Sequence, residues 1–125
     1  MLQGLMSNTP LLITAIMRAA EQNHGDREIV SVTADQSRHR YTYRDAFARS
    51  RQLANALLKL GLEPGDRVAT LAWNDHRHFE LYYAISCAGF VCHTINPRLF
   101  GEQITYIIKH AADKVVFVDP MFVPL

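Results

Sequence analysis

Cysteine is scarce in this sequence of 125 residues. Only Cys87 and Cys92 are present, and both lie in one apolar stretch. Two cysteines are too few for the framework of a small disulfide-rich domain, and a metal site needs more ligands at closer spacing. We therefore expect both thiols to pack as small apolar side chains.

Long apolar runs are also missing. The longest segments without Lys, Arg, Asp or Glu are Met1–Met17 and Leu81–Pro97. Both are shorter than the ~20 apolar residues that a membrane-spanning helix needs. Met1–Pro10 contains no Lys or Arg, so the basic start of a secretory signal is absent. These patterns are typical of a cytoplasmic protein without a transmembrane segment.

No excess of charge of one sign is present. Thirteen basic residues oppose twelve acidic ones, the net charge is +1, and the arginines are scattered among acids. A nucleic-acid-binding protein would normally show a basic patch, so we expect no nucleic-acid partner. The hydrophobic fraction of 49% and the length fit one small globular domain.

The first third of the chain predicts a helix followed by a hairpin. Apolar residues recur at helical spacing from Thr9 to about Gln22, and they are Leu11, Leu12, Ala15, Ile16 and Ala19. Ser7, Asn8 or Thr9 could cap this helix, with Pro10 in its first turn. The stretches 28–33 and 38–41 read as two short strands, because the polar turn 35–37 separates them.

A second helix has the clearest boundaries. Thr42 and Asp45 match a capping box, in which a hydroxyl residue is followed three residues later by an acid. The helix continues to about Leu60, and Gly61 supplies the left-handed residue that commonly ends helices.

After Gly65 the pattern alternates between apolar strands and helices. The expected strands are 67–72, 90–95 and 114–118, and the expected helices are 75–88, capped by Asn74, and 102–112. Apolar strands joined by helices predict a parallel sheet covered on both faces. We assign the chain to the α/β class, with an amino-terminal helix and a short β-hairpin followed by a βαβαβ unit. Three parallel strands make a small sheet, so we expect residues 1–125 to be an incomplete part of a larger domain.

The loops that bind phosphates in such folds are missing. The turn after the first parallel strand contains Trp73 and Asp75 where a dinucleotide site needs glycines, and its carboxylate would repel a phosphate. No Walker-type loop and no nucleophile elbow occurs. His76 and His78 are two residues apart on a helix, so they point in different directions and make a poor metal pair. We therefore predict no catalytic, cofactor-binding or metal-binding residue in the chain.

One group of polar residues lies where α/β sheets bind ligands. His93 and Thr94 lie near the carboxyl end of an expected parallel strand, and Asn96 follows it. Ligands bind outside the carboxyl ends of such strands, so these three residues are the candidates to lie near a substrate. The alternative is a buried histidine that is hydrogen-bonded to a neighbouring backbone group, and a turn at Asn96–Arg98 that fixes the exit of the strand.

Several segments, taken in order, resemble the AMP-forming acyl-CoA synthetase family. They are Tyr41-Thr42-Tyr43-Arg44-Asp45, the segment 53–57, Leu60-Gly61-Leu62-Glu63-Pro64-Gly65-Asp66-Arg67-Val68-Ala69, His93-Thr94-Ile95-Asn96-Pro97-Arg98-Leu99, 104–111 and 114–120. The version at 93–99 is similar to medium- and long-chain fatty-acid ligases. The resemblance covers nearly the whole chain from about Pro10 onward. One departure is Phe100-Gly101, where relatives commonly start a helix with a hydroxyl residue or a proline.

The resemblance implies a ligase that joins a fatty acid to coenzyme A. In that family a carboxylate attacks ATP, and the thiol of coenzyme A then displaces AMP. The phosphate loop, the glutamate that holds magnesium and the catalytic lysine lie downstream of the region that matches this chain. ATP, Mg and coenzyme A are thus implied for the complete enzyme only, and we expect the 125-residue chain alone to be inactive.

Two other functions stay open. A stand-alone, non-catalytic α/β module could bind a protein partner, or a second copy in a homodimer, through the edge of its small sheet. A small flavodoxin-like domain with its own cofactor is disfavoured, because no loop suits a phosphate.

Overall fold

The computed structural model describes residue 4 and residues 8–125. The helices are α1 (Ile13–His24), α2 (Tyr43–Lys59), α3 (His76–Cys87) and α4 (Gly101–Ala111), and a short 3-10 turn spans Pro120–Phe122. The strands are β1 (Glu28–Val32), β2 (Arg38–Thr42), β3 (Arg67–Leu71), β4 (Val91–Thr94) and β5 (Val115–Val118). The α/β class and the order of elements predicted from the sequence are confirmed.

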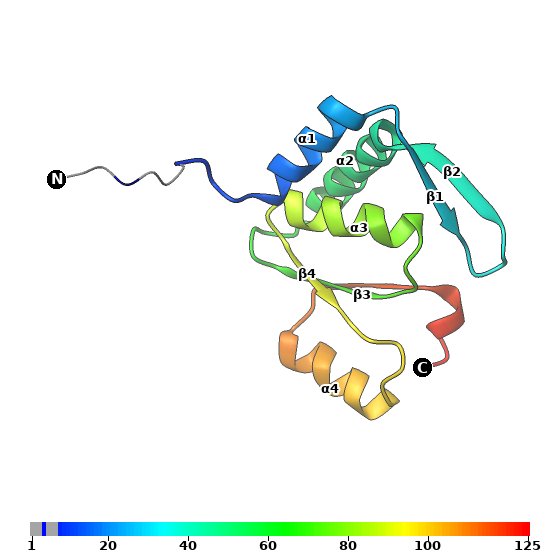
Figure 1. Cartoon of the computed structure of the whole chain (residues 1–125). Helices are drawn as coiled ribbons and strands as arrows, with labels where there is room; N and C mark the ends of the chain where they lie inside the picture. Colours follow the sequence, from blue (N-terminus) through cyan, green and yellow to red (C-terminus); the bar gives the residue numbers. More distant parts are fainter. Residues whose placement is uncertain (1–3, 5–7) are drawn as a thin grey trace.

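A three-stranded parallel sheet divides the molecule into two layers of helices. Helices α1, α2 and α3 lie on one side of the sheet and α4 on the other, while the β1–β2 hairpin extends at the side (Figure 1). The strand order is β4-β3-β5, and β3 is parallel to both neighbours. The hairpin is antiparallel, with Glu28 opposite Thr42 and Val32 opposite Arg38.

Each face of the sheet carries its own core. Val68 in β3 packs with residues of α2 and α3, and the members of this core are Leu57, Leu62, Val68, Leu81, Ile85 and Phe90. Ala69 faces the opposite way and packs with α4, in a core made by Ala69, Leu71, Ile95, Ile104 and Phe122. Because β3 is covered on both faces, its sequence reads as a continuous apolar run.

The predicted start of α2 is confirmed in detail. Thr42 Oγ1 accepts a hydrogen bond from the backbone N–H of Asp45, and Asp45 Oδ2 accepts one from the backbone N–H of Thr42. These bonds satisfy two N–H groups that a helix start otherwise leaves unpaired. At the other end, Gly61 has a φ of 83°, as a glycine after a helix commonly does.

The first helix differs from its prediction. It begins at Ile13 after Leu12, with no side-chain cap, so neither Asn8 nor Thr9 caps it and Pro10 lies before its first turn; the third candidate cap, Ser7, lies outside the described residues. Its buried residue is Met17, whereas five neighbouring apolar residues are exposed, namely Leu11, Leu12, Ile13, Ala15 and Ile16. Helical spacing identified an apolar stripe, but α1 turns a different side toward α2 and α3.

Two further helix starts were predicted with the wrong residue. Helix α3 is capped by Asp75 and not by Asn74, since Asp75 Oδ1 accepts the N–H groups of Arg77 and His78 at 2.8 and 3.2 Å. Helix α4 begins one residue earlier than expected, at Gly101, after Phe100 without a side-chain cap. Gln103 Oε1 accepts the N–H of Phe100 at 3.1 Å, and this bond partly replaces the missing hydroxyl residue.

None of the helices within residues 8–125 combines the length and the apolar character needed to cross a membrane.

Candidate functional site

The chain reverses its winding direction between β3 and β5. Helix α3 carries the chain from β3 to β4 on one side, and α4 returns it across β3 to β5 on the other. In doubly wound sheets the crevice at such a switch point, outside the carboxyl ends of the two strands, is where ligands bind. The fold therefore directs attention to the loop after β3, which contains Trp73 and Asp75, and to Asp119 directly after β5.

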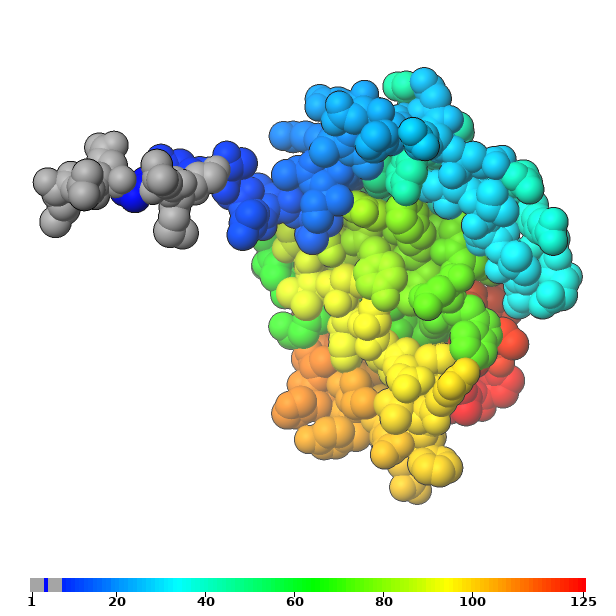
Figure 2. Space-filling view, viewed as in Figure 1, coloured from blue at the N-terminus to red at the C-terminus, as the bar shows by residue number. Residues whose placement is uncertain are grey.

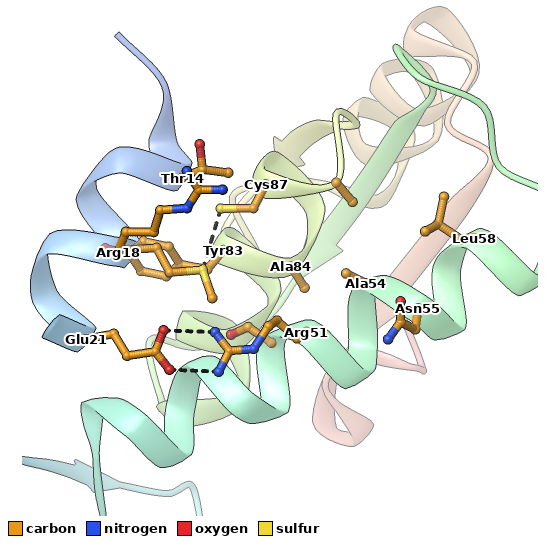
Figure 3. Close-up of a pocket in the computed structure, with 13 residues that line it drawn as sticks. Thr14, Arg18, Glu21, Arg51, Ala54, Asn55, Leu58, Tyr83, Ala84 and Cys87 are labelled. Carbon is orange, nitrogen blue, oxygen red and sulfur yellow. Dashed lines mark hydrogen bonds and ion pairs between the residues drawn. The ribbon is translucent and has the colours of Figure 1, made fainter. Parts of the chain in front are cut away.

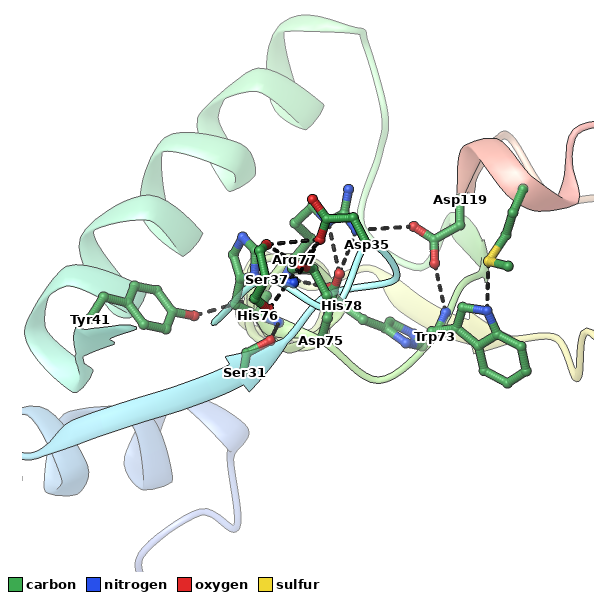
Figure 4. Close-up of polar contacts among 12 residues, drawn as sticks. Ser31, Asp35, Ser37, Tyr41, Trp73, Asp75, His76, Arg77, His78 and Asp119 are labelled. Atoms are coloured by element: carbon green, nitrogen blue, oxygen red, sulfur yellow. Dashed lines mark hydrogen bonds and ion pairs between the residues drawn. The ribbon is translucent and has the colours of Figure 1, made fainter. Parts of the chain in front are cut away.

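The two loops are tied together by backbone and side-chain bonds. Asp119 Oδ2 accepts the backbone N–H of Trp73 at 2.8 Å, and the backbone N–H of Asp119 donates to the carbonyl of Leu71 at 3.0 Å. The indole N–H of Trp73 donates to Met121 Sδ at 2.7 Å (Figure 4). These bonds connect the loop after β3 to the segment after β5.

Arg77 lies between two carboxylates at this point. Its guanidinium bonds to Asp75 Oδ2 at 2.5 and 2.9 Å and lies 3.6 Å from Asp119 Oδ1. Burial raises the pKa of Asp75, but hydrogen bonds from the Arg77 side chain and from the N–H groups of α3 outweigh it, so the pKa of Asp75 lies below its ordinary value. The amino end of α3, a common anion site, already holds the carboxylate of Asp75.

A crevice of about 420 Å³ lies between these residues and the tip of the hairpin. The hairpin contributes residues 33–35 and Ser37, and the opposite wall is formed by His76, Arg77, Asp119, Pro120 and Met121. Figure 2 shows the hairpin at the edge of the molecule beside the carboxyl-terminal segment. The lining contains two acids, Asp35 and Asp119, and one arginine, Arg77, so its formal charge is negative and disfavours a phosphate.

The polar candidates predicted from the sequence lie elsewhere. His93 Nδ1 bonds to both carboxylate oxygens of Asp113, at 2.9 and 3.0 Å, and the Asp113 side chain is fully buried. Asp113 belongs to the loop between α4 and β5, toward the amino ends of the strands. Thr94 and Asn96 are exposed at the carboxyl end of β4, and Asn96 Oδ1 accepts the N–H of Arg98 at 2.9 Å, within the expected turn. The structure thus does not bring the three together, and their contact with a substrate stays a prediction.

Sequence reasoning missed both Asp113 and the Asp75–Arg77–Asp119 group. An acid directly after a buried strand was a usable signal for Asp119, but its meaning depends on the strand order, which the sequence does not reveal. Asp113 follows Ala112, whose φ of 52° marks a left-handed helix end, and no residue type there announces a buried carboxylate.

A second cavity, of about 350 Å³, lies between the three helices that cover one face of the sheet (Figure 3). Met17, Ala84 and Cys87 line it, and Arg51 spans its rim with two bonds to Glu21 at 2.7 and 3.0 Å. Burial raises the pKa of the Cys87 thiol, which makes it a poor nucleophile. Both cysteines are free thiols, and Cys92 packs against the first core, as expected of small apolar side chains.

Across residues 8–125, no three His, Cys, Asp or Glu side chains converge as a metal site requires. The residues present therefore do not fit the magnesium that the resemblance implies for a complete enzyme, and no step through it can be assigned to them.

Comparison with known proteins gives the class. Residues 16–123 match the family described as AMP-binding enzyme, so the chain belongs to that family. It is 54% identical over 122 residues to a 3-methylmercaptopropionyl-CoA ligase of Ruegeria lacuscaerulensis. The aligned segment covers 98% of this chain and 23% of that protein. It is 52% identical over 122 residues to a medium-chain-fatty-acid–CoA ligase of Ectopseudomonas oleovorans, with coverage of 98% and 22%.

Solved structures of acyl-CoA ligases have the same fold as this chain. The fatty acyl CoA synthetase of Mycobacterium tuberculosis superposes with a TM-score of 0.78 at 27% identity, covering 90% of this chain and 22% of that one. An anthranilate CoA ligase superposes with a TM-score of 0.82 over 95% of this chain and 23% of its own, and at 23% identity that likeness shows the fold alone. The chain thus spans less than a quarter of the length of these relatives.

Proposed function

We propose that this chain is the opening section of an acyl-CoA ligase that activates an aliphatic carboxylic acid. The observation that carries the proposal is the identity of 52–54% over 122 residues to two proteins named as such ligases. Within the part of the chain that the structure describes, β4 and β5 each pair with β3 alone, so both edges of the sheet are open.

The proposed reaction has two steps. A carboxylate oxygen of the acid attacks the α-phosphorus of ATP, and pyrophosphate leaves, which gives an acyl-adenylate. The thiol of coenzyme A then attacks the acyl carbonyl carbon, loses its proton, and AMP leaves. ATP, a fatty acid and coenzyme A are the proposed substrates, magnesium is the proposed metal, and the cytoplasm is the proposed compartment.

In the complete enzyme, these residues build part of the fold around the substrate and supply no catalytic group. We assign Thr94 and Asn96, at the carboxyl end of β4, as the residues nearest a substrate. His93 positions that strand through its bond to the buried Asp113. The 125-residue chain alone carries no phosphate loop, and we expect it to be inactive.

The test is an assay of the protein purified from its own cells with an antibody against this chain. Release of AMP and formation of a CoA thioester would be followed with acids from acetate to palmitate. We expect turnover that requires ATP, coenzyme A and the acid together, and no turnover by the isolated chain. Native protein that forms no thioester with any acid would contradict the proposal. Turnover by the isolated chain would contradict the expectation that the 125-residue chain alone is inactive.

The alternative is a stand-alone module that binds a protein partner. The open edges favour it, because β4 and β5 present Val91 and Val118, which are 48% and 38% exposed. Assembly of the isolated chain into a defined dimer as its concentration rises would support this alternative. A monomer at all concentrations would remove the case for a homodimer.

A further inference from the structure

Two histidines form a face-to-face contact between the hairpin and α3. The rings of His39 in β2 and His76 in the first turn of α3 have centroids 3.8 Å apart and planes inclined by 19°. The ring of Tyr41 packs edge-on against both, at centroid distances of 4.7 and 6.0 Å. The contact brings together residues 37 positions apart in the sequence.

Few other bonds hold the hairpin at this place. The backbone N–H of His76 donates to Ser31 Oγ at 2.9 Å, and the Tyr41 hydroxyl donates to the carbonyl of His76 at 3.4 Å (Figure 4). A two-stranded hairpin is marginally stable by itself in water. The stacked pair and these two bonds therefore contribute to its orientation on α3, together with the direct continuation of β2 into α2.

The contact requires both imidazoles to be neutral. His39 Nε2 and His76 Nδ1 are buried without a hydrogen-bond partner, so a proton added there would find no acceptor. Two cationic rings at this spacing would also repel each other, and the amino end of α3 disfavours a positive charge.

The surrounding charges do not reverse this preference. Burial lowers the pKa of His76, and His39 and Arg77 lower it further, whereas Asp75 and Glu80 raise it. Both acids are already paired, Asp75 with Arg77 and Glu80 with Arg49 of α2 at 2.7 Å. Tyr41, the remaining titratable group against the rings, stays neutral because burial and Glu80 raise its pKa.

We propose that the His39–His76 pair is an acid-sensitive latch, which holds the hairpin against α3 while both rings are neutral and releases it when they are protonated. Release also opens the crevice at the switch point, because the hairpin tip forms one of its walls. The latch is a property of this chain and does not depend on ligase activity.

Amide hydrogen exchange tests the latch. Exchange of residues 28–42 and of β3 would be measured by mass spectrometry at about pH 7.5 and about pH 5, either side of the ordinary pKa of histidine. After correction for intrinsic rates, we expect hairpin protection to fall about tenfold at the lower pH, while β3 keeps its protection. Equal protection of the hairpin at both pH values would overturn the proposal.

Paired variants separate titration from packing. The double variant His39→Phe, His76→Phe keeps two stacked rings that cannot be protonated, and its hairpin protection should not change with pH. The control His110→Gln removes an exposed histidine on α4, and it should respond like the wild type. A double variant that still loses hairpin protection in acid would contradict the latch.

A titration of the wild type needs no variant. The ring protons of His76, followed by NMR, should titrate below the ordinary histidine pKa because burial lowers its pKa, and the hairpin resonances should shift over the same range. Hairpin resonances that do not shift as His76 titrates would overturn the proposal.

Discussion

The carboxylate of Asp119 accepts the backbone N–H of Trp73 at 2.8 Å, and this bond joins the end of β5 to the loop after β3. The Asp119 side chain is 12% exposed and also faces Arg77. One residue therefore connects the two strands between which the fold changes its winding direction.

Removing that carboxylate should destabilise the switch point. We expect Asp119→Ala to lower the free energy of unfolding by about 1–3 kcal/mol, because it leaves the N–H of Trp73 without an acceptor. Asp119→Asn should cost less, since its amide oxygen can still accept. Urea unfolding followed by the fluorescence of Trp73, the single tryptophan, gives the values. As a control, Asp26→Ala removes an exposed pair with Arg44 and should change stability by less than about 1 kcal/mol. Similar losses in both alanine variants would contradict this role of Asp119.

Acid should weaken the fold through its hydrogen-bonded carboxylates. Hydrogen bonds from Thr33 and Ser37 lower the pKa of Asp35 to about 2, and a hydrogen bond from Thr42 lowers the pKa of Asp45. The pKa of Asp75 is lowered as well. Because these values are lower in the folded state, the unfolded chain binds more protons as the pH falls below about 4. The contribution of these three carboxylates to stability should be complete above that range and lost progressively toward about pH 2.

The urea midpoint measured between about pH 5 and pH 2 checks this dependence. Asp75→Asn keeps a capping oxygen but cannot be protonated, so it should flatten the slope. A midpoint that is constant or rises toward acid pH would be inconsistent with the lowered pKa values.

A stabilising substitution is expected after α4. Ala112 has a φ of 52°, a left-handed conformation that costs an L-residue roughly 1 kcal/mol and that glycine adopts freely. Ala112→Gly should therefore raise the free energy of unfolding by about 0.5–1 kcal/mol. The reciprocal control is Gly61→Ala at φ 83°, where nothing obstructs a Cβ, and it should destabilise by about 1 kcal/mol. Thermal unfolding of both variants tests the pair, and a loss of stability in Ala112→Gly would refute the argument.

Substitution of His93 should lower stability, whereas substitution of Thr94 should change KM for the acid. The carboxylate of Asp113 is fully buried, and across residues 8–125 its one hydrogen-bond partner is His93 Nδ1. Asp113→Ala and His93→Gln should therefore each cost about 1–3 kcal/mol. Thr94→Ala, at an exposed position, should leave stability within about 0.5 kcal/mol. In an active ligase that carries this segment, Thr94→Ala should change KM for the acid. The reverse assignment, with stability dependent on Thr94 and not on His93, would be inconsistent with these contacts.

Local rules predicted the fold better than the site. The capping box at Thr42 and Asp45 depends on neighbours in the sequence, and it forms as expected. The apolar strands around Val68 and Val116 gave the parallel sheet, because burial on both faces leaves a direct mark on composition. The exposed side of α1 could not be predicted, because Leu12 and Ile16 fit a helical stripe equally well whichever side meets α2 and α3.

The candidate site depends on relations between distant residues. Asp119 lies beside Trp73 only because α4 carries the chain back across β3, and a sequence pattern does not specify that crossing. For the same reason His93 was predicted without its partner Asp113. Residue types therefore marked polar candidates, while the strand order decided which of them lie close together.

We propose that these residues form the opening section of an acyl-CoA ligase. The most direct test replaces the matching segment of the Ectopseudomonas oleovorans medium-chain-fatty-acid–CoA ligase by this chain and measures CoA thioester formation from octanoate. Since the two segments are 52% identical over 122 residues, we expect a folded chimera that keeps kcat/KM within about tenfold of the parent, a loss of no more than about 1.4 kcal/mol. A chimera that folds with the parent's thermal stability but forms no thioester would contradict the claim.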